Sequence, residues 1–82
     1  QIFDIEQNKT LHDHIILLGY GRLGRKISEK LDNRGVKYIA IEHNIYNVKQ
    51  GQKEGKSVIF GNAANKTILE SVNIVDAAVV IV

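Results

Sequence analysis

Three glycines, Gly19, Gly21 and Gly24, have the spacing G-x-G-x-x-G, and this spacing indicates phosphate chemistry. They follow the apolar run HIILL and precede a segment of helical period. In that setting the first glycine permits a tight turn, the second lets the backbone approach a phosphate, and the third lets the helix pack closely on the strand. The free N–H groups at the helix start then face the anion. The sequence therefore predicts a phosphate-binding turn, and the alternative is a strand-to-helix turn with no ligand.

One acidic residue, Glu42, ends the second apolar run, KYIAIE. An acid at the tip of the second strand of such a fold accepts hydrogen bonds from ribose hydroxyls and repels a 2′-phosphate. This position favours NAD or an adenosine nucleotide over NADP. The alternative is a solvated charge at a strand end.

Four other residues belong to the candidate site. Arg22 lies inside the glycine turn, where its guanidinium is suited to phosphate oxygens. His43 follows Glu42 and is expected at the edge of the ribose or base. Asn62 and Ala63, within FGNAAN, follow the third apolar run: Asn62 offers a donor and an acceptor, and Ala63 is small enough for a flat base to rest against it. A simple turn and helix cap is the alternative for these last two residues.

The elements that must position these residues alternate along the chain. Residues 14–19, 37–42, 56–61 and 77–82 are short, β-branched-rich runs that are apolar on both faces, as buried parallel strands are. Between them lie three segments of helical character. Leu23, Ile27 and Leu31 mark the first, which Gly35 ends, whereas Asn44 and Asn65 are candidate N-caps of the other two.

This alternation predicts an α/β fold, a Rossmann-like doubly wound parallel sheet of strand order 3-2-1-4, over residues 14–82. Residues 1–13 are polar and are expected to be a lead-in or linker. Because the fourth run would leave an apolar sheet edge unpaired, we expect a longer polypeptide or a sheet completed by a second copy.

Composition excludes several classes of function. The chain has 82 residues, a net charge of +2 and no cysteine, so neither a disulfide framework nor a thiolate metal site is available. Its Lys and Arg residues are interleaved with acids along the sequence, which argues against nucleic-acid binding. No apolar run is long enough for a membrane-spanning helix. His12 and His14 have no third ligand nearby, and no metal site is predicted.

No catalytic motif is recognisable in the sequence. It contains no Tyr-x-x-x-Lys pair, no nucleophile elbow and no distinct acid–base pair of carboxylates. The strand and helix pattern nevertheless retains the βαβαβ half that binds one mononucleotide. We therefore expect a nucleotide-binding domain that is not an enzyme; the cofactor half of an NAD-dependent oxidoreductase and a methyltransferase are the alternatives.

The segments HIILLGYGRLGRKISEKL, YIAIEHN and VIFGNAANKTILESVNIVDAAVVIV together resemble the RCK or KTN (TrkA-N type) regulatory domain of potassium transport. The GYGRLG turn is most similar to that of Kef-type monovalent cation:proton antiporters. The resemblance implies an adenine nucleotide (AMP, ADP or ATP) or NAD(H), not NADP, on the turn that includes Tyr20 and Leu23. Glu42 would contact the ribose, and Asn62 and Ala63 would lie near the base. Many members have Gly-Asp-Ala where this chain has GNA.

The resemblance also implies partners and a location. Such domains pair with a second copy and pass a nucleotide-dependent rearrangement to a membrane transporter. The chain is accordingly expected on the cytoplasmic side of the cell membrane, as a homodimeric regulatory domain of a potassium or other monovalent cation transporter.

Overall fold

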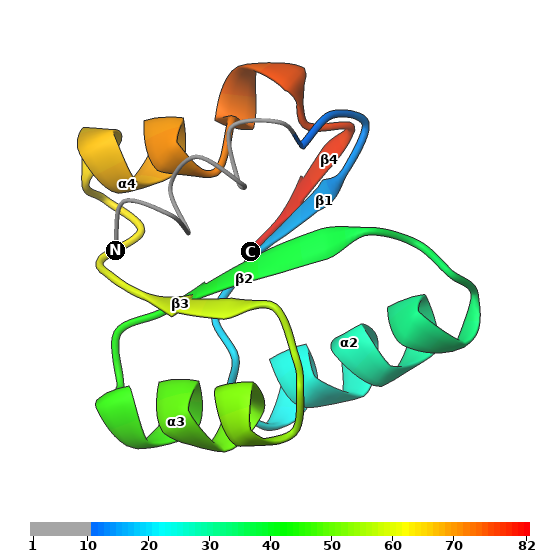
Figure 1. Cartoon of the computed structure of the whole chain (residues 1–82). Coiled ribbons are helices and arrows are strands. Elements are labelled where there is room, and N and C mark those ends of the chain that lie inside the picture. The colour runs from blue at the N-terminus through cyan, green and yellow to red at the C-terminus, as the bar shows by residue number, and fades with distance from the viewer. Residues whose placement is uncertain (1–10) are drawn as a thin grey trace.

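The computed structural model describes residues 11–82, which form a four-stranded sheet and flanking helices (Figure 1). The strands are β1 (Ile15–Leu18), β2 (Tyr38–Glu42), β3 (Val58–Phe60) and β4 (Val79–Ile81). The helices are α2 (Arg22–Asn33), α3 (Ile45–Lys53), α4 (Lys66–Ser71) and the 3-10 helix η1 (Ile74–Asp76). No helix within residues 11–82 is long and apolar enough to cross a bilayer.

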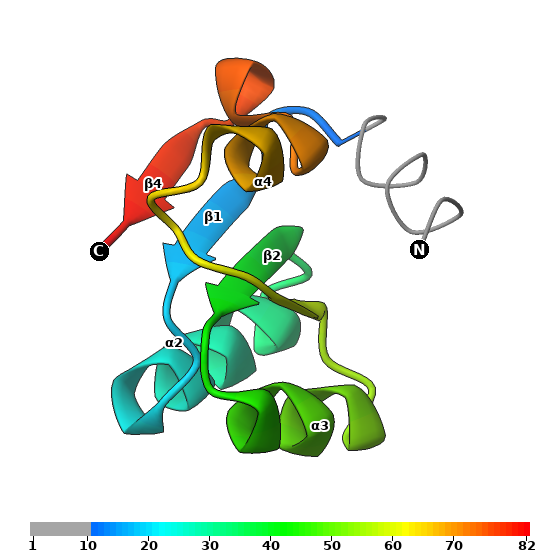
Figure 2. The ribbon, with the colours of Figure 1, turned by 90° about the vertical axis from the view of Figure 1, so that its left-hand side faces the viewer.

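The sheet is entirely parallel and has the order β3-β2-β1-β4, which confirms the predicted 3-2-1-4 arrangement. Helices α2 and α3 cover one face, and α4 with η1 covers the other (Figures 1 and 2). Helices lie on both faces because right-handed crossovers from β1 run first toward β3 and then back toward β4. The carboxyl ends of the first three strands consequently meet at one edge of the sheet.

Alternate residues of β1, β2 and β3 fill two separate cores, which explains why these segments are apolar on both faces. The fourth apolar run differs from the expected buried strand, because Val79 and Val80 of β4 are exposed at the edge of the sheet. In β1, Leu17 packs in the core beneath α2 and α3, together with Ala40 and Val48. Its neighbour Ile16 packs in the opposite core, against Val72. The fold therefore depends on apolar side chains at consecutive strand positions.

The predicted helix boundaries are confirmed by their capping contacts. The Asn44 side chain accepts a hydrogen bond from the Tyr46 N–H at 2.9 Å, and Asn65 accepts one from the Ile68 N–H at 3.1 Å. Gly35 adopts a left-handed φ of 68° just after α2. These residues fix where each helix begins or ends, and therefore where the loops at the sheet edge begin.

Two further features differ from the sequence-based expectation. The strands are shorter than the apolar runs because residues at the ends of those runs lie in turns; Gly19, for example, has a φ of 126°. The helix that begins after Asn65 ends at Ser71, and η1 follows, because Asn73 takes a left-handed φ of 56° and breaks the helical path.

Part of the predicted lead-in contacts the folded domain. The Asp13 N–H donates to the Asp76 carbonyl oxygen at 2.8 Å, and the Asn73 amide donates to the Leu11 carbonyl at 2.6 Å. His14 is fully buried and its Nε2 lies 2.7 Å from the Val72 carbonyl oxygen. The rest of the lead-in, residues 1–10, lies outside the described residues, and its role as a linker stays a prediction.

Candidate functional site

A cleft of about 300 Å³ lies at the carboxyl edge of the sheet, where the loops after β1, β2 and β3 meet. Two backbone hydrogen bonds tie these loops together: Gly19 N–H to the Ile41 carbonyl at 2.9 Å and Gly61 N–H to the Glu42 carbonyl at 3.0 Å. Five of the predicted site residues line this cleft: Gly19, Glu42, His43, Asn62 and Ala63. The fold therefore brings together three sequence motifs that are far apart in the chain.

The glycine turn has the geometry that its spacing predicts. Gly19 has a φ of 126°, a conformation that residues with a side chain rarely adopt. A Cβ on Gly24 would lie 2.5 Å from the Gly19 carbonyl oxygen, so α2 approaches β1 too closely for any side chain there. A Cβ on Gly21 would meet no heavy atom within 4 Å, so this position faces open space.

The start of α2 exposes uncapped backbone donors. Gly21 is the N-cap residue and supplies no side-chain hydrogen bond. Within residues 11–82, the N–H groups of residues 21–24 make no hydrogen bond to another group of the protein. Such donors, with the positive end of the helix dipole, stabilise an anion placed above them.

Two further clefts border the glycine turn. One, of about 290 Å³, lies beside β4 and is apolar apart from the turn, with Leu23, Ile27, Ile81 and Val82 in its lining. The other, of about 350 Å³, lies between α2 and α3. Arg22, the first residue of α2, lines both of these clefts but not the cleft beside Glu42. Arg22 thus lies at the N-terminal end of α2, away from the cleft that Glu42 lines.

Glu42 is buried, with 5% of its side chain exposed, and the interpretation of it as a solvated charge is wrong. Its Oε1 accepts the Tyr20 N–H at 2.6 Å, and its Oε2 accepts the Asn44 N–H at 2.9 Å. The Asn47 amide donates to Oε2 at 3.4 Å, and His43 Nδ1 lies 3.6 Å from the same oxygen. The carboxylate thus joins the glycine turn to the loop after β2.

The same contacts set the ionisation of Glu42. Burial alone raises the pKa of a carboxyl group, but here the hydrogen bonds from Tyr20, Asn44 and Asn47 outweigh it, so the pKa of Glu42 lies below its ordinary value. The group is therefore ionised at neutral pH. A carboxylate has about four acceptor sites, so it can accept hydroxyl donors while keeping its two backbone bonds.

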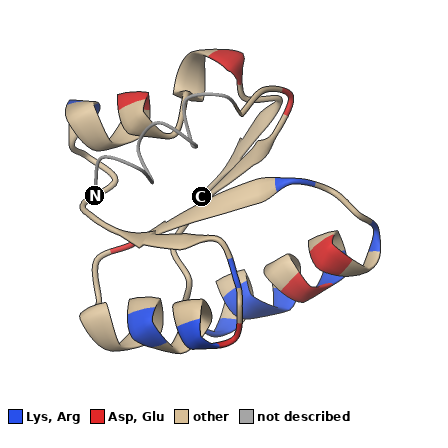
Figure 3. Cartoon of the chain, viewed as in Figure 1, with Lys and Arg blue, Asp and Glu red and all other residues tan. Residues whose placement is uncertain are grey.

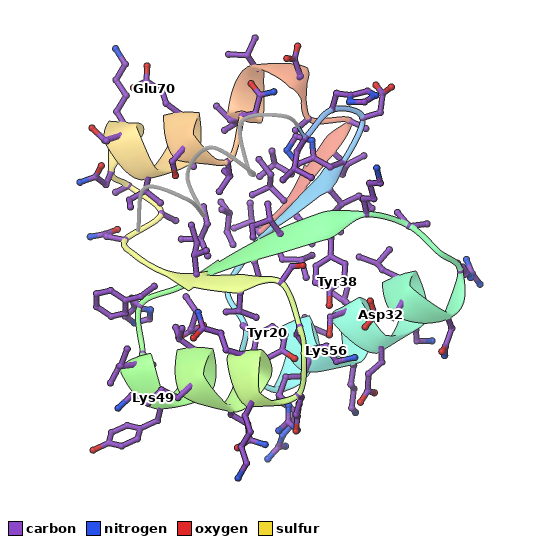
Figure 4. The ribbon with its side chains drawn as sticks, viewed as in Figure 1. Tyr20, Asp32, Tyr38, Lys49, Lys56 and Glu70 are labelled. Carbon is purple, nitrogen blue, oxygen red and sulfur yellow. The ribbon has the colours of Figure 1, made fainter. Side chains whose placement is uncertain are left out.

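Tyr20 differs most from its prediction as a residue of the cofactor site. Its side chain is 1% exposed and packs in the core under α2 and α3, with Val48 and Val58 (Figure 4). Only its backbone N–H reaches the site, through Glu42. Side-chain alternation along the strand could not have indicated this, because it would put Tyr20 on the same side of the sheet as Leu18. The turn at Gly19 instead directs Tyr20 to the side of Leu17.

The Asn62 side chain is oriented by its own loop. Its Oδ1 accepts the Ala64 N–H at 2.8 Å, which leaves the amide nitrogen with its two donors for the cleft that it lines. Asn44 and Asn47 are site-supporting residues that sequence reasoning missed as such. Their signal was proximity: both follow the acidic residue closely at the start of α3.

His, Asp and Glu side chains in residues 11–82 form no group of three that could hold a metal ion. His14, one of the two histidines considered for a metal site, is bonded to the Val72 carbonyl at the start of β1. This position is at the opposite edge of the sheet from the cleft beside Glu42.

Fold and glycine turn together define a Rossmann-like α/β domain. Residues 15–82 match the TrkA-N domain family, and the chain belongs to that family. It is 33% identical over 70 residues to a "Putative cation/proton antiporter YbaL" of Escherichia coli and 27% identical over 78 residues to a "Glutathione-regulated potassium-efflux system protein" of Haemophilus influenzae. It is also 35% identical over 69 residues to a "Probable potassium channel protein 2" of Methanocaldococcus jannaschii.

These alignments cover most of this chain and a small part of each relative. They include 80%, 95% and 80% of the chain, respectively, but 12%, 13% and 20% of the three relatives. The similarity to the Kef-type proteins expected from the sequence is confirmed, since a KefC protein of Cronobacter sakazakii also matches at 31% identity over 67 residues.

Proposed function

We propose that this domain regulates a monovalent cation transporter by binding an adenine nucleotide (AMP, ADP or ATP) or NAD(H). One observation carries the proposal: the buried, ionised Glu42 carboxylate lies beside the start of α2, where the backbone N–H groups of residues 21–24 make no hydrogen bond within residues 11–82. A nucleotide requires hydrogen-bond donors for its phosphate oxygens and, close to them, an acceptor for its ribose hydroxyls. The names of the relatives, which include antiporters, an efflux system and a potassium channel, support a role in cation transport.

Each part of the nucleotide has a counterpart among the chain's residues. The N–H groups of residues 21–24 and the Arg22 guanidinium bind the phosphates, with Leu23 beside them. Glu42 accepts the ribose hydroxyls, and His43 borders the sugar or base. Asn62 donates to the base and Ala63 gives it a flat contact. A 2′-phosphate would meet the Glu42 carboxylate, so NADP(H) is disfavoured by like-charge repulsion.

The bound nucleotide acts as a signal in this proposal, not as a reactant. The domain lies on the cytoplasmic side of the membrane and pairs with a second copy. The ligand favours one arrangement of the two paired domains, and this arrangement is transmitted to the transporter portion. To shift such an equilibrium from 1:99 to 99:1, the ligand must bind one arrangement roughly 10⁴-fold more tightly. The alternative, an NAD-dependent oxidoreductase, would require hydride transfer from NADH to a second substrate.

Thermal melting with candidate ligands tests the proposal. A ligand at about 100 times its Kd adds roughly 2.7 kcal/mol to the free energy of unfolding, and a domain of this size then melts about 10–20 °C higher. We expect that response with AMP, ATP, NAD or NADH and none with NADPH. A response to S-adenosylmethionine alone, or to NADPH as large as to NADH, would contradict the proposal.

A substitution at Gly21 tests whether the ligand binds at the start of α2. Gly21→Asp places a carboxylate where the backbone is open and where Asp is a good N-cap, so the free protein should keep its stability. The added carboxylate occupies the helix donors itself, and the ligand response should disappear. Ala78→Asp adds the same charge to an exposed residue just before β4, at the opposite edge of the sheet, and should leave the response unchanged.

A further inference from the structure

The fold separates charges that are mixed in the sequence. Most Lys and Arg residues within 11–82 lie on α2, α3 or the loops that leave them, and Lys66 on α4 is the exception (Figure 3). The α2–α3 half holds Arg22, Arg25, Lys26, Lys30, Arg34, Lys37, Lys49, Lys53 and Lys56. Its exposed acids are Glu29, Asp32 and Glu54, whereas the α4 half has Asp13, Glu70 and Asp76 beside Lys66.

Four lysines form outward-facing stripes on the two helices. Lys26 and Lys30 are four residues apart on α2, and Lys49 and Lys53 are four apart on α3, so each pair shares a helix face; all four are exposed. Tyr46, 79% exposed, continues the α3 stripe one turn earlier. We call these five residues the basic face. Lys49 and Glu70 project on opposite sides of the sheet (Figure 4).

Two of the three exposed acids on this half pair with cations outside the basic face; the third, Glu29, lines a cleft with Lys26 and leaves the other three lysines of the face without an acid beside them in a cleft or ion pair of residues 11–82. Glu54 pairs with Arg25 at 3.4 Å, and Asp32 pairs with Lys56 at 2.5 Å. Within residues 11–82, none of the four lysines of the basic face takes part in an ion pair. The charge of this surface is therefore available to an external partner.

We propose that the basic face docks onto an anionic lipid surface. Charge complementarity favours an anionic lipid surface as the partner, because two neighbouring helices present positive charge over one side of the sheet. The acidic α4 half would face away from such a surface. Long lysine side chains and an exposed tyrosine suit a lipid headgroup region, where the apolar stem or ring is covered and the polar tip stays wet. Nucleic acid is the competing polyanion, and the test below separates the two.

The docking surface is largely separate from the nucleotide site: of its five residues, Lys26 alone also lines the cleft between α2 and α3 that includes Gly21 and Arg22. The basic face lies on the outer side of α2 and α3, whereas the cleft that holds Glu42 and Asn62 opens at the carboxyl edge of the sheet. Docking therefore does not require the ligand, and loss of nucleotide binding would not remove it. In the proposed transporter, it would fix which side of the domain faces the membrane.

Vesicle flotation of the whole chain tests the proposal. We expect binding to vesicles of phosphatidylcholine with phosphatidylglycerol and not to phosphatidylcholine alone, since a lysine near an anionic leaflet strengthens binding about fivefold. Raising the salt from about 0.1 M to about 1 M shortens the screening length from about 10 Å to about 3 Å and should release the protein. Equal binding to both vesicle types, or binding that resists high salt, would overturn the proposal.

Matched charge reversals locate the surface. Lys49→Glu should weaken binding to the anionic vesicles at least about fivefold, and Lys49→Glu with Lys53→Glu at least about 25-fold. Lys66→Glu makes the same charge change on the other half and should alter binding less than twofold. Thermal melting verifies that each variant is folded. An equal loss with Lys66→Glu would show a net-charge effect and would refute a defined face.

Two further arms separate lipid docking from nucleotide binding and from nucleic-acid binding. Gly21→Asp, which is designed to abolish nucleotide binding, should float with the vesicles as the unmodified chain does, so failure of the nucleotide proposal leaves this one intact. A fluorescent single-stranded or double-stranded DNA or RNA oligonucleotide should not compete the chain off the vesicles at equal phosphate concentration. Preferential binding to any of these oligonucleotides would overturn the lipid assignment in favour of nucleic acid.

Discussion

Replacing Glu42 by glutamine should destabilise the domain even without any ligand. The change keeps the shape of the side chain but removes its charge and turns one acceptor oxygen into a donor NH₂ group. In the native site both oxygens accept backbone N–H groups, from Tyr20 at 2.6 Å and Asn44 at 2.9 Å. Glutamine has one oxygen, so one of these N–H groups would face another donor in a buried place.

The size of the effect follows from those two bonds. A hydrogen bond to a charged partner contributes about 1.5–3 kcal/mol, and an unsatisfied buried group costs about 1–3 kcal/mol. We expect Glu42→Gln to lower the free energy of unfolding by about 2–3 kcal/mol at pH 7. For a domain of 60–100 residues that is a decrease of roughly 10–20 °C in the melting temperature.

The effect should depend on pH in a definite direction. The pKa of Glu42 is lowered in the folded protein, so its contribution to stability is complete above the ordinary carboxyl pKa and is lost as the pH falls through the folded value. The stability gap between the unmodified chain and Glu42→Gln should accordingly be widest near pH 7 and should shrink as the solution is acidified toward pH 3.

Urea unfolding of the ligand-free chain, followed by circular dichroism at several pH values, measures both quantities. Glu54→Gln is the matched control, because Glu54 is more exposed and its pair with Arg25 is long, at 3.4 Å; its effect should stay within about 0.5 kcal/mol. If Glu42→Gln at pH 7 fell within the same limit, or if its effect were unchanged at low pH, the argument that Glu42 holds the glycine turn would be refuted.

Three further substitutions test the packing around the site. Gly24→Ala places a Cβ 2.5 Å from the Gly19 carbonyl oxygen, and we expect a loss of about 1–3 kcal/mol in urea unfolding. Gly51→Ala, which would add about 1 kcal/mol of stability in an open helix, should instead destabilise the chain, because its Cβ would lie 2.7 Å from Val58; a higher melting temperature would contradict this. Asn44→Ala removes the cap of α3 and should lower stability by about 1 kcal/mol, measured in the same way.

The helix caps and the strand order were readable from local patterns. Asn44 and Asn65 cap the helices as expected because an N-cap depends on a few neighbouring residues. The strand order followed from handed crossovers, which apply to any chain of alternating strands and helices. The tight packing at Gly51 could not be predicted from local patterns, because the side chains that a Cβ there would meet, Tyr20 and Val58, come from distant parts of the sequence.

The sequence by itself determined the glycine turn, the acidic residue at the end of β2 and the family resemblance, since these depend on residue type and short-range spacing. Tertiary structure alone decided three other properties. It buried Glu42 against the backbone of the glycine turn, directed the Tyr20 side chain into the core, and gathered scattered lysines on one face. Each of these properties depends on which segments, far apart in the sequence, the crossovers bring close together in space. Residue spacing along the chain does not specify those spatial distances.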